Sequence, residues 1–223
     1  WFDTYIDHAL VVPTGMPRLS HSQDDTHTTV NWLYADGRAL ICRSPKQAIA
    51  LVGIPEVTPH MLADWCNAKL LELFPDEVKG LSISFVPERI DGASYHYSHG
   101  LQQHDGNCQR IAHGHRSALE IYIDDQRDEQ LEAQWAKRFE DIYIGTRDHL
   151  VSDADGMHHY AYAAPQGAFE LKLPADVCYL IDTETTVELI ARHLADQIKH
   201  DLPDAAVMVK AFEGVGKGAI AEA

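Results

Sequence analysis

The sequence is poor in basic residues: 18 lysines and arginines stand against 34 aspartates and glutamates, which gives a formal net charge of -16. Binding to nucleic acid or to an anionic membrane surface depends on clustered basic side chains, so we expect neither partner. The sequence also lacks any run of about 18 apolar residues, the length that a helix needs to cross a bilayer. We therefore expect a soluble protein.

Cysteine is scarce as well. Cys42, Cys66, Cys108 and Cys178 are widely scattered and form no Cys-x-x-Cys pair. In a chain of 223 residues this pattern indicates reduced thiols rather than a disulfide framework, so we expect a cytoplasmic protein. Hydrophobic residues make up 45% of the chain, which is enough for one large domain or two small ones.

Three features occur twice along the chain in the same order. They are an Asp-His pair followed by apolar residues, a threonine that opens a stretch with apolar residues at helical spacing, and a strand-like alternation that ends at a glutamate. The first set is Asp7-His8, Thr58 and Glu88, and the second set is Asp148-His149, Thr185 and Glu213. We infer one and a half copies of a module, with a partial module over residues 1–93 and a complete module over residues 94–223.

Local patterns predict individual elements. Asp36-Gly37 between two apolar runs is a hairpin signal, and Thr185-x-x-Glu188 has the form of a capping box at the start of a helix. The alternation of Leu81, Ile83 and Phe85 predicts a strand that reaches Glu88. The segment from Gly214 to Gly218 predicts a tight turn between two C-terminal strands, because it lacks the spacing of a phosphate-binding loop.

Histidine is abundant, with 14 copies in the chain. From His113 to Asp124 the odd positions carry two histidines, a serine and then apolar residues. Successive side chains of a strand point to opposite faces, so His113 and His115 project together at one end of a buried stripe. Two such imidazoles suit a zinc ion, and His99, after the strand-like run from Ser94, is the natural third ligand. Three ligands with one open position are typical of catalytic zinc.

These motifs together resemble one family. His-x-Leu, His-Asp-Gly-x-Cys and His-Gly-His, followed by Asp-His, by Thr-x-Glu at the start of a helix and by a strand that ends in Glu, are similar to the 6-pyruvoyltetrahydropterin synthase and 6-carboxytetrahydropterin synthase family. The resemblance covers residues 94–223, with a weaker half-copy over residues 1–88. It implies an α+β fold of tandem tunnelling-fold (T-fold) modules. Each module would be a small antiparallel sheet with two helices packed on one side.

The resemblance also implies roles for site residues. His99, His113 and His115 would hold Zn2+, with Cys108 as the general base. Asp148 and His149 would be the pair that transfers protons with Cys108, and Glu213 would bind the pterin ring with Thr186 close to it. A thiol near a metal and an imidazolium has a lowered pKa, and a carboxylate can accept two hydrogen bonds from the edge of a pterin.

The family's sites form at seams between modules or between the subunits of a homo-oligomer. Two alternatives therefore stay open: Asp7-His8 could face Cys108 in place of Asp148-His149, and Glu88 could stand in for Glu213. A triphosphorylated substrate also requires positive charge near the site, against the net charge of the chain. Arg110 and Lys217, both in predicted loops, are best placed to supply it.

The expected function follows from this resemblance. The His-Asp-Gly-x-Cys form is closer to the 6-carboxytetrahydropterin synthase branch, the enzyme of queuosine biosynthesis. We expect a zinc-dependent lyase that converts 7,8-dihydroneopterin triphosphate into 6-carboxy-5,6,7,8-tetrahydropterin. The alternatives are a 6-pyruvoyltetrahydropterin synthase, which eliminates triphosphate, and a pterin-binding module without catalysis.

Overall fold

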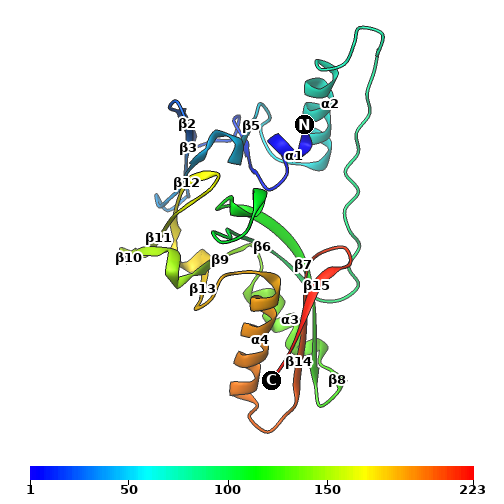
Figure 1. Cartoon of the computed structure of the whole chain (residues 1–223), viewed down its shortest axis with the longest axis vertical. Helices are drawn as coiled ribbons and strands as arrows, with labels where there is room; N and C mark the ends of the chain where they lie inside the picture. The colour runs from blue at the N-terminus through cyan, green and yellow to red at the C-terminus, as the bar shows by residue number, and fades with distance from the viewer.

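A computed structural model describes residues 1–223 (Figure 1). Its elements mix helices with strands, which confirms the expected α+β class. The elements before residue 94 are α1 (Phe2–Tyr5), β1 (Leu10–Pro13), β2 (Leu19–Gln23), β3 (His27–Leu33), β4 (Ala39–Pro45), the 3-10 turn η1 (Lys46–Ala48), β5 (Ile49–Val52) and α2 (Pro59–Leu71).

The remaining elements lie between Ser94 and Glu222. They are β6 (Ser94–His99), η2 (Gly106–Gln109), β7 (His113–Ile123), β8 (Gln126–Arg127), α3 (Glu129–Arg138), β9 (Ile142–Thr146), η3 (Arg147–His149), β10 (Leu150–Ala154), β11 (Met157–Ala164), β12 (Gly167–Pro174), η4 (Ala175–Val177), β13 (Cys178–Ile181), α4 (Val187–Asp201), β14 (Val207–Gly214) and β15 (Lys217–Glu222).

A seven-stranded sheet carries the predicted site residues. Its strands follow the order β13-β9-β6-β7-β14-β15, and β8 pairs with β7. The expected antiparallel sheet corresponds to β6, β7, β14 and β15, but β9 pairs in parallel with both β6 and β13, so the sheet as a whole is mixed. Both α3 and α4 contact this sheet.

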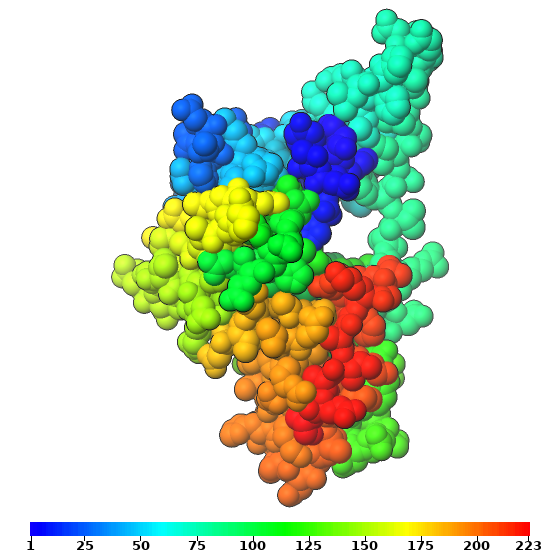
Figure 2. All heavy atoms as spheres, in the orientation of Figure 1, coloured from blue at the N-terminus to red at the C-terminus, as the bar shows by residue number.

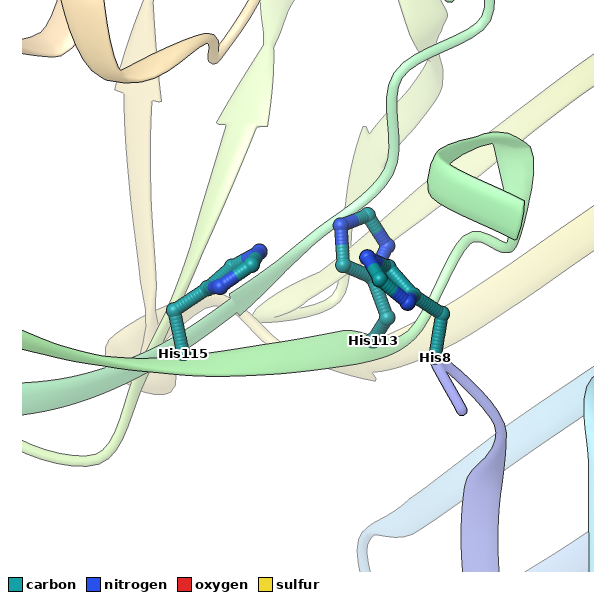
Figure 3. A group of neighbouring side chains, drawn as sticks. All are labelled: His8, His113 and His115. Atoms are coloured by element: carbon teal, nitrogen blue, oxygen red, sulfur yellow. The ribbon is translucent and has the colours of Figure 1, made fainter. Parts of the chain in front are cut away.

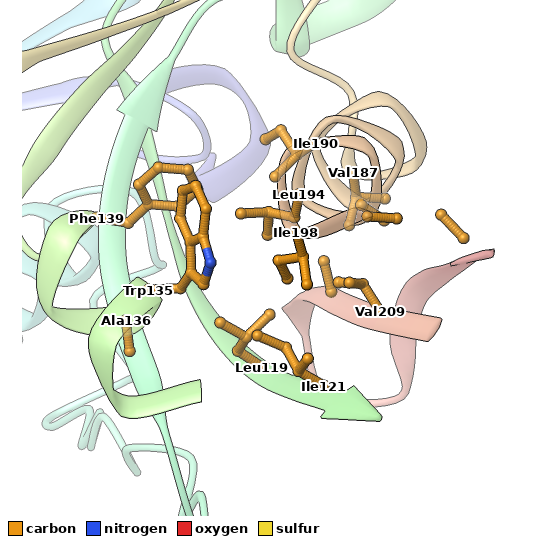
Figure 4. Packing of buried hydrophobic residues seen from close by; sticks show 14 of the residues in the cluster. Leu119, Ile121, Trp135, Ala136, Phe139, Val187, Ile190, Leu194, Ile198 and Val209 are labelled. Atoms are coloured by element: carbon orange, nitrogen blue, oxygen red, sulfur yellow. The ribbon is translucent and has the colours of Figure 1, made fainter. Parts of the chain in front are cut away.

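One hydrophobic core joins these helices to the sheet (Figure 4). Leu194 of α4 and Ile121 of β7 are fully buried in it, together with Phe139 after α3. Burial of a side chain of this size contributes roughly 1.5–3 kcal/mol. The apolar face of α4 therefore fixes the position of this helix, including its first turn, relative to β7 and β14.

A second sheet runs across both parts of the chain. Its order is β10-β11-β12-β4-β3-β2, and β4 pairs with β12 in an antiparallel register that sets Cys42 opposite Leu171. Side chains from both parts also share a second core, including Val30, Phe169 and Tyr143. The division between residues 93 and 94 stays a prediction, but the two parts pack as one body across it.

The order of elements repeats around this second sheet. A strand, a three-stranded meander, a 3-10 turn, a strand paired in parallel with the first, and a helix occur as β1 to α2 and again as β9 to α4. The predicted Asp-His match does not fit this order. Asp7-His8 comes before β1, whereas Asp148-His149 comes after β9, so the two pairs lie at opposite ends of corresponding strands.

Several local predictions are confirmed. The Asp36-Gly37 turn joins β3 to β4 with a positive φ of 87° at Gly37, and the turn near residue 216 joins β14 to β15. Thr58 caps α2 by accepting a hydrogen bond from the Met61 N–H at 3.2 Å. The predicted capping box of α4 is wrong: Thr186, not Thr185, is the N-cap, and its N3 residue is Leu189, which has no side-chain acceptor to complete a box.

The predicted strand through Leu81, Ile83 and Phe85 is wrong for this chain. Residues 78–91 form no helix or strand, and in Figure 1 the segment after α2 runs along one side of the molecule without an arrow. Val86 is 85% exposed. An alternating pattern makes a strand only where another strand offers backbone partners, and none of the chain's strands pairs with this segment.

None of the helices has the length and apolar character needed to span a membrane.

Candidate functional site

The three predicted zinc histidines lie at one end of the β6–β7 pair. His99 is the last residue of β6, and the antiparallel register sets it opposite His113 on β7. His115 lies two residues further along, where strand alternation returns its side chain to the same face. The ring centres are 4.3 Å apart for His99–His113, 5.0 Å for His99–His115 and 5.1 Å for His113–His115.

Each of these rings is held by a backbone carbonyl. Nδ1–H donates in every case: His99 to the Thr185 carbonyl at 2.8 Å, His113 to the Arg110 carbonyl at 2.7 Å, and His115 to the Glu213 carbonyl at 3.1 Å. A carbonyl can only accept, so each Nδ1 carries the proton and each Nε2 keeps its lone pair. This outer support of three imidazoles is typical of metal ligands.

The free nitrogens are suited to a cation. His99 and His113 are almost fully buried, and the Nε2 of each has no hydrogen-bond partner. Burial lowers the pKa of all three rings, to about 3 for His113 and well below the ordinary value for His99. Buried polar atoms without partners are costly, and a bound metal would satisfy them. The donor set therefore fits zinc.

A fourth histidine enters from the first part of the chain. The ring of His8 lies 4.9 Å from that of His113 and 6.0 Å from that of His115, and Figure 3 shows it reaching toward them from the N-terminal segment. Ligand atoms of His8, His113 and His115 lie within 4.8 Å of one another. Two possible donor sets share the pair on β7: the set with His8 has its ligand atoms within this distance, whereas the set with His99 rests on the ring-centre distances.

Contacts of the remaining atoms separate these two sets. His8 Nε2 lies 3.6 Å from Cys108 Sγ, and His8 Nδ1 lies 2.8 Å from Asp7 Oδ2. His99 Nε2 has no such neighbour. The arrangement Asp7–His8–Cys108 has the order of groups in which a carboxylate orients an imidazole and the imidazole exchanges a proton with a thiol.

The structure does not bring Asp148-His149 to Cys108. His149 Nε2 lies 3.2 Å from Gln102 Oε1, and its ring packs on Tyr162 with centres 4.5 Å apart. This pair comes after β9, whereas Asp7-His8 comes before β1. The alternative that the sequence left open, Asp7-His8 facing Cys108, is the arrangement found here.

A pocket of about 120 Å³ lies beside these residues. Its walls include His8, Cys108, His113, His115, Thr186, Glu213 and Lys217. Lys217 Nζ forms an ion pair with the Glu213 carboxylate, and its side chain is 75% exposed. Ligand pockets usually measure roughly 300–1,000 Å³. The pocket is therefore small for a bicyclic ligand.

Cys108 lines this pocket and is partly exposed. Burial raises the pKa of the Cys108 thiol, while the ammonium of Lys217 acts in the opposite direction. A thiol in this state needs an adjacent base to lose its proton near neutral pH, and His8 is placed to be that base.

The other predicted charged residues are placed differently. Arg110 is only 2% exposed, and its guanidinium is used by backbone carbonyls of Thr4 and Asp7, so it is not directed at a substrate phosphate. Glu88 is outside the pocket, and its carbonyl accepts a hydrogen bond from Arg116. Of these two predicted carboxylates, Glu213 lines the pocket and Glu88 does not; Glu188 lines it as well.

Sequence reasoning missed the supporting residues. Thr185 was expected to cap α4 but instead supports the His99 ring with its carbonyl and, at 3.0 Å, its hydroxyl oxygen. The hydrogen bonds from Arg110 to the backbone carbonyls of Thr4 and Asp7 were also missed. No local pattern marks either contact, because the partners are 86 and 103 residues apart in the chain.

Comparisons with known proteins identify a family. The family model described as 6-pyruvoyl tetrahydropterin synthase matches residues 91–223, more than half of the chain. A comparison with curated proteins found no match. Among solved structures, the 6-pyruvoyltetrahydropterin synthase of Plasmodium vivax is similar at 16% identity and a TM-score of 0.46, and that of Plasmodium falciparum at 10% identity and a TM-score of 0.44. Each similarity covers 58% of this chain and 91% of the other chain. The chain belongs to the 6-pyruvoyl tetrahydropterin synthase family.

Proposed function

We propose that the protein is a zinc-dependent lyase acting on 7,8-dihydroneopterin triphosphate, with 6-carboxy-5,6,7,8-tetrahydropterin as its product. The observation that carries the proposal is the convergence of three carbonyl-supported histidines beside a cysteine that contacts an Asp-His pair. Membership of a family of lyases supports the reaction class. The 6-carboxy product is favoured by the His-Asp-Gly-x-Cys form of the segment around Cys108.

His99, His113 and His115 are the residues we expect to hold zinc. Bound zinc would supply Lewis acidity that stabilises negative charge on side-chain oxygens of the substrate. Family resemblance supports this set over the set that contains His8. Ring nitrogens without a hydrogen-bond partner occur in both sets, at His99 and His113 and also at His8. His8 is then left free for proton transfer.

Cys108 is the proposed general base, working with His8. The 3.6 Å contact between Sγ and Nε2 lets a proton pass between them, and Asp7 orients the imidazole through Nδ1. These residues replace Asp148-His149 in the role that the sequence suggested. The thiol is at the pocket, so it can reach a proton on the side chain of a ligand bound there.

Glu213 and Thr186 are the proposed contacts for the pterin ring. The Glu213 side chain is only 11% exposed and is directed into the pocket. A carboxylate that accepts two hydrogen bonds can replace its ion pair with Lys217 by a pair with the ring edge. Lys217, once released, is free to contact an anionic part of the substrate.

We also propose that the chain consists of tandem T-fold modules, the first of them partial. The repeated order of elements from β1 to α2 and from β9 to α4 supports this reading. A homo-oligomer and a cytoplasmic location remain predictions. The outer edge of β15 pairs with no strand of this chain, which leaves one edge at which a second copy could pair.

Product analysis tests the proposed function. Zinc-loaded protein is incubated with 7,8-dihydroneopterin triphosphate, with Cys108→Ala as the matched control. The proposal predicts the 6-carboxy compound with wild type and at least about a hundredfold slower formation with the variant. A 6-pyruvoyl product would reassign the chain to the other branch of the family. Binding without turnover would make the chain a pterin-binding module.

A further inference from the structure

The residues on either side of Cys108 hold the segment that carries His8. Arg110 Nη1 donates to the Asp7 carbonyl at 2.6 Å, and Nη2 donates to the Thr4 carbonyl at 3.3 Å. Asn107 Nδ2 donates to the Asp3 carbonyl at 2.8 Å. The same short loop thus presents the thiol and grips the backbone that brings the imidazole to it. In Figure 2 the N-terminal residues, in blue, lie directly against the green residues near position 110.

Arg110 is held in place from its other side. Its Nε lies 3.5 Å from Gln166 Oε1, while Gln166 Nε2 donates to Asn107 Oδ1 at 3.0 Å. Arg110 is 2% exposed, and none of the ion pairs of the protein includes it. A buried guanidinium without a carboxylate is costly. Its donors are satisfied instead by carbonyls of the segment 1–8 and by Gln166.

The backbone at His8 needs such support. His8 has a φ of 54°, in the left-handed region that residues other than glycine seldom adopt. Conformations of this kind persist where the surroundings impose them, and they are found at functional sites. The helix α1 next to it has only four residues, too few to hold this geometry by itself.

We propose that Arg110, assisted by Asn107, is a positioning residue that keeps the His8 imidazole against the Cys108 thiol by fixing the backbone of residues 3–8. The carbonyl of Arg110 also supports His113. One residue therefore links the histidine cluster to the proton-transfer pair across two parts of the chain. The catalytic readout of this proposal rests on the proposed function, whereas its structural readout does not.

The test compares Arg110→Met with Arg38→Met. Arg38 also joins the two parts of the chain, through Asp176 at 2.8 Å, but lies away from the pocket. Hydrogen exchange is measured for the amides of residues 2–9, together with the metal content after zinc loading. Arg110→Met should speed this exchange at least about tenfold and leave the zinc content unchanged. Arg38→Met should alter neither quantity.

Kinetics in two backgrounds supply the second readout. In wild type, Arg110→Met should lower kcat on the order of a hundredfold with little change in KM, as for a displaced catalytic group. In a His8→Asn background the same change should cost less than about twofold, because the group that Arg110 positions is already missing. Asn is chosen because it tolerates positive φ.

Specific outcomes would overturn the proposal. Equal losses in both backgrounds, a raised KM in place of a lowered kcat, or loss of zinc would each show that Arg110 acts through something other than His8. Arg110→Lys keeps the charge but cannot span two carbonyls, so its hydrogen exchange and its kcat should lie between those of wild type and Arg110→Met. If Arg110→Met does not fold, Arg110→Lys replaces it in both measurements. If wild type does not turn over the pterin, the proposed function fails, and unchanged exchange at residues 2–9 would still refute the positioning role.

Discussion

His8 should be essential for turnover, and His149 should not. The comparison is between His8→Asn and His149→Asn, two changes that each remove one imidazole. His8 Nε2 lies 3.6 Å from Cys108 Sγ, whereas His149 Nε2 is engaged with Gln102 at 3.2 Å. Only the first change removes a group next to the thiol.

The structure sets the size of each effect. Loss of a positioned acid or base costs a factor of about 10²–10⁴ in rate, which corresponds to roughly 2.7–5.5 kcal/mol of transition-state stabilisation. We therefore expect His8→Asn to lower kcat by at least a factor of about 10². His149→Asn should lower kcat by less than about threefold, or ~0.7 kcal/mol. It should instead reduce the free energy of unfolding by about 1 kcal/mol, because it disturbs a partly buried hydrogen bond.

The assay is steady-state turnover of 7,8-dihydroneopterin triphosphate by zinc-loaded protein, with thermal unfolding measured on the same samples. The zinc content of each variant must equal that of wild type for the rates to be compared. A hundredfold loss with His149→Asn and near-normal kcat with His8→Asn would refute the assignment of His8 and return the role to Asp148-His149.

Three further outcomes follow from the site. Cys108→Ala should keep its zinc, measured by metal analysis, while kcat falls by about a hundredfold or more; loss of the metal would make the cysteine a ligand. Glu213→Gln should raise KM roughly 10–100-fold, since a hydrogen bond to a charged group contributes about 1.5–3 kcal/mol, and an unchanged KM would place the ring anchor elsewhere. Folding lowers the pKa of His113 from 6.5 to about 3. Below a pH of about 6.5, the unfolded metal-free protein therefore binds a proton at this residue that the folded protein does not. Its free energy of unfolding should therefore fall as the pH drops from about 7 to about 5, by about 2 kcal/mol from this residue. Urea unfolding of His113→Gln should show a shallower pH dependence, and an unchanged slope would count against a buried neutral imidazole.

Local patterns predicted much of the fold and the centre of the site. Strand alternation placed His113 and His115 on one face, and the strand-like run before His99 placed the third imidazole beside them. The helix after Thr58 and the hairpin at Asp36-Gly37 were equally accessible. These features depend on neighbours a few residues apart, which a single sequence shows directly.

Features set by distant contacts could not be predicted in the same way. The alternation through Ile83 suggests a strand, yet no other strand of the chain lies alongside to pair with it. Asp148-His149 has the same two residues as Asp7-His8, but Asp7-His8 precedes β1, whereas Asp148-His149 follows the corresponding strand β9. The contact between Cys108 and His8 joins residues 100 positions apart. Strand pairing and contacts between residues far apart in the sequence are fixed by the packing of the whole chain.

The metal content of two variants distinguishes the two sets of histidine ligands. Purified protein is stripped of metal, loaded with zinc, freed of excess ion and analysed for zinc per chain, for wild type, His99→Ala and His8→Asn. We expect about one zinc per chain in wild type and in His8→Asn, and almost none in His99→Ala, since three protein ligands are needed to retain a catalytic ion. Zinc retained in His99→Ala and lost in His8→Asn would refute the assignment of His99, because the ion would then be held by His8, His113 and His115, and His8 could not serve Cys108 in proton transfer.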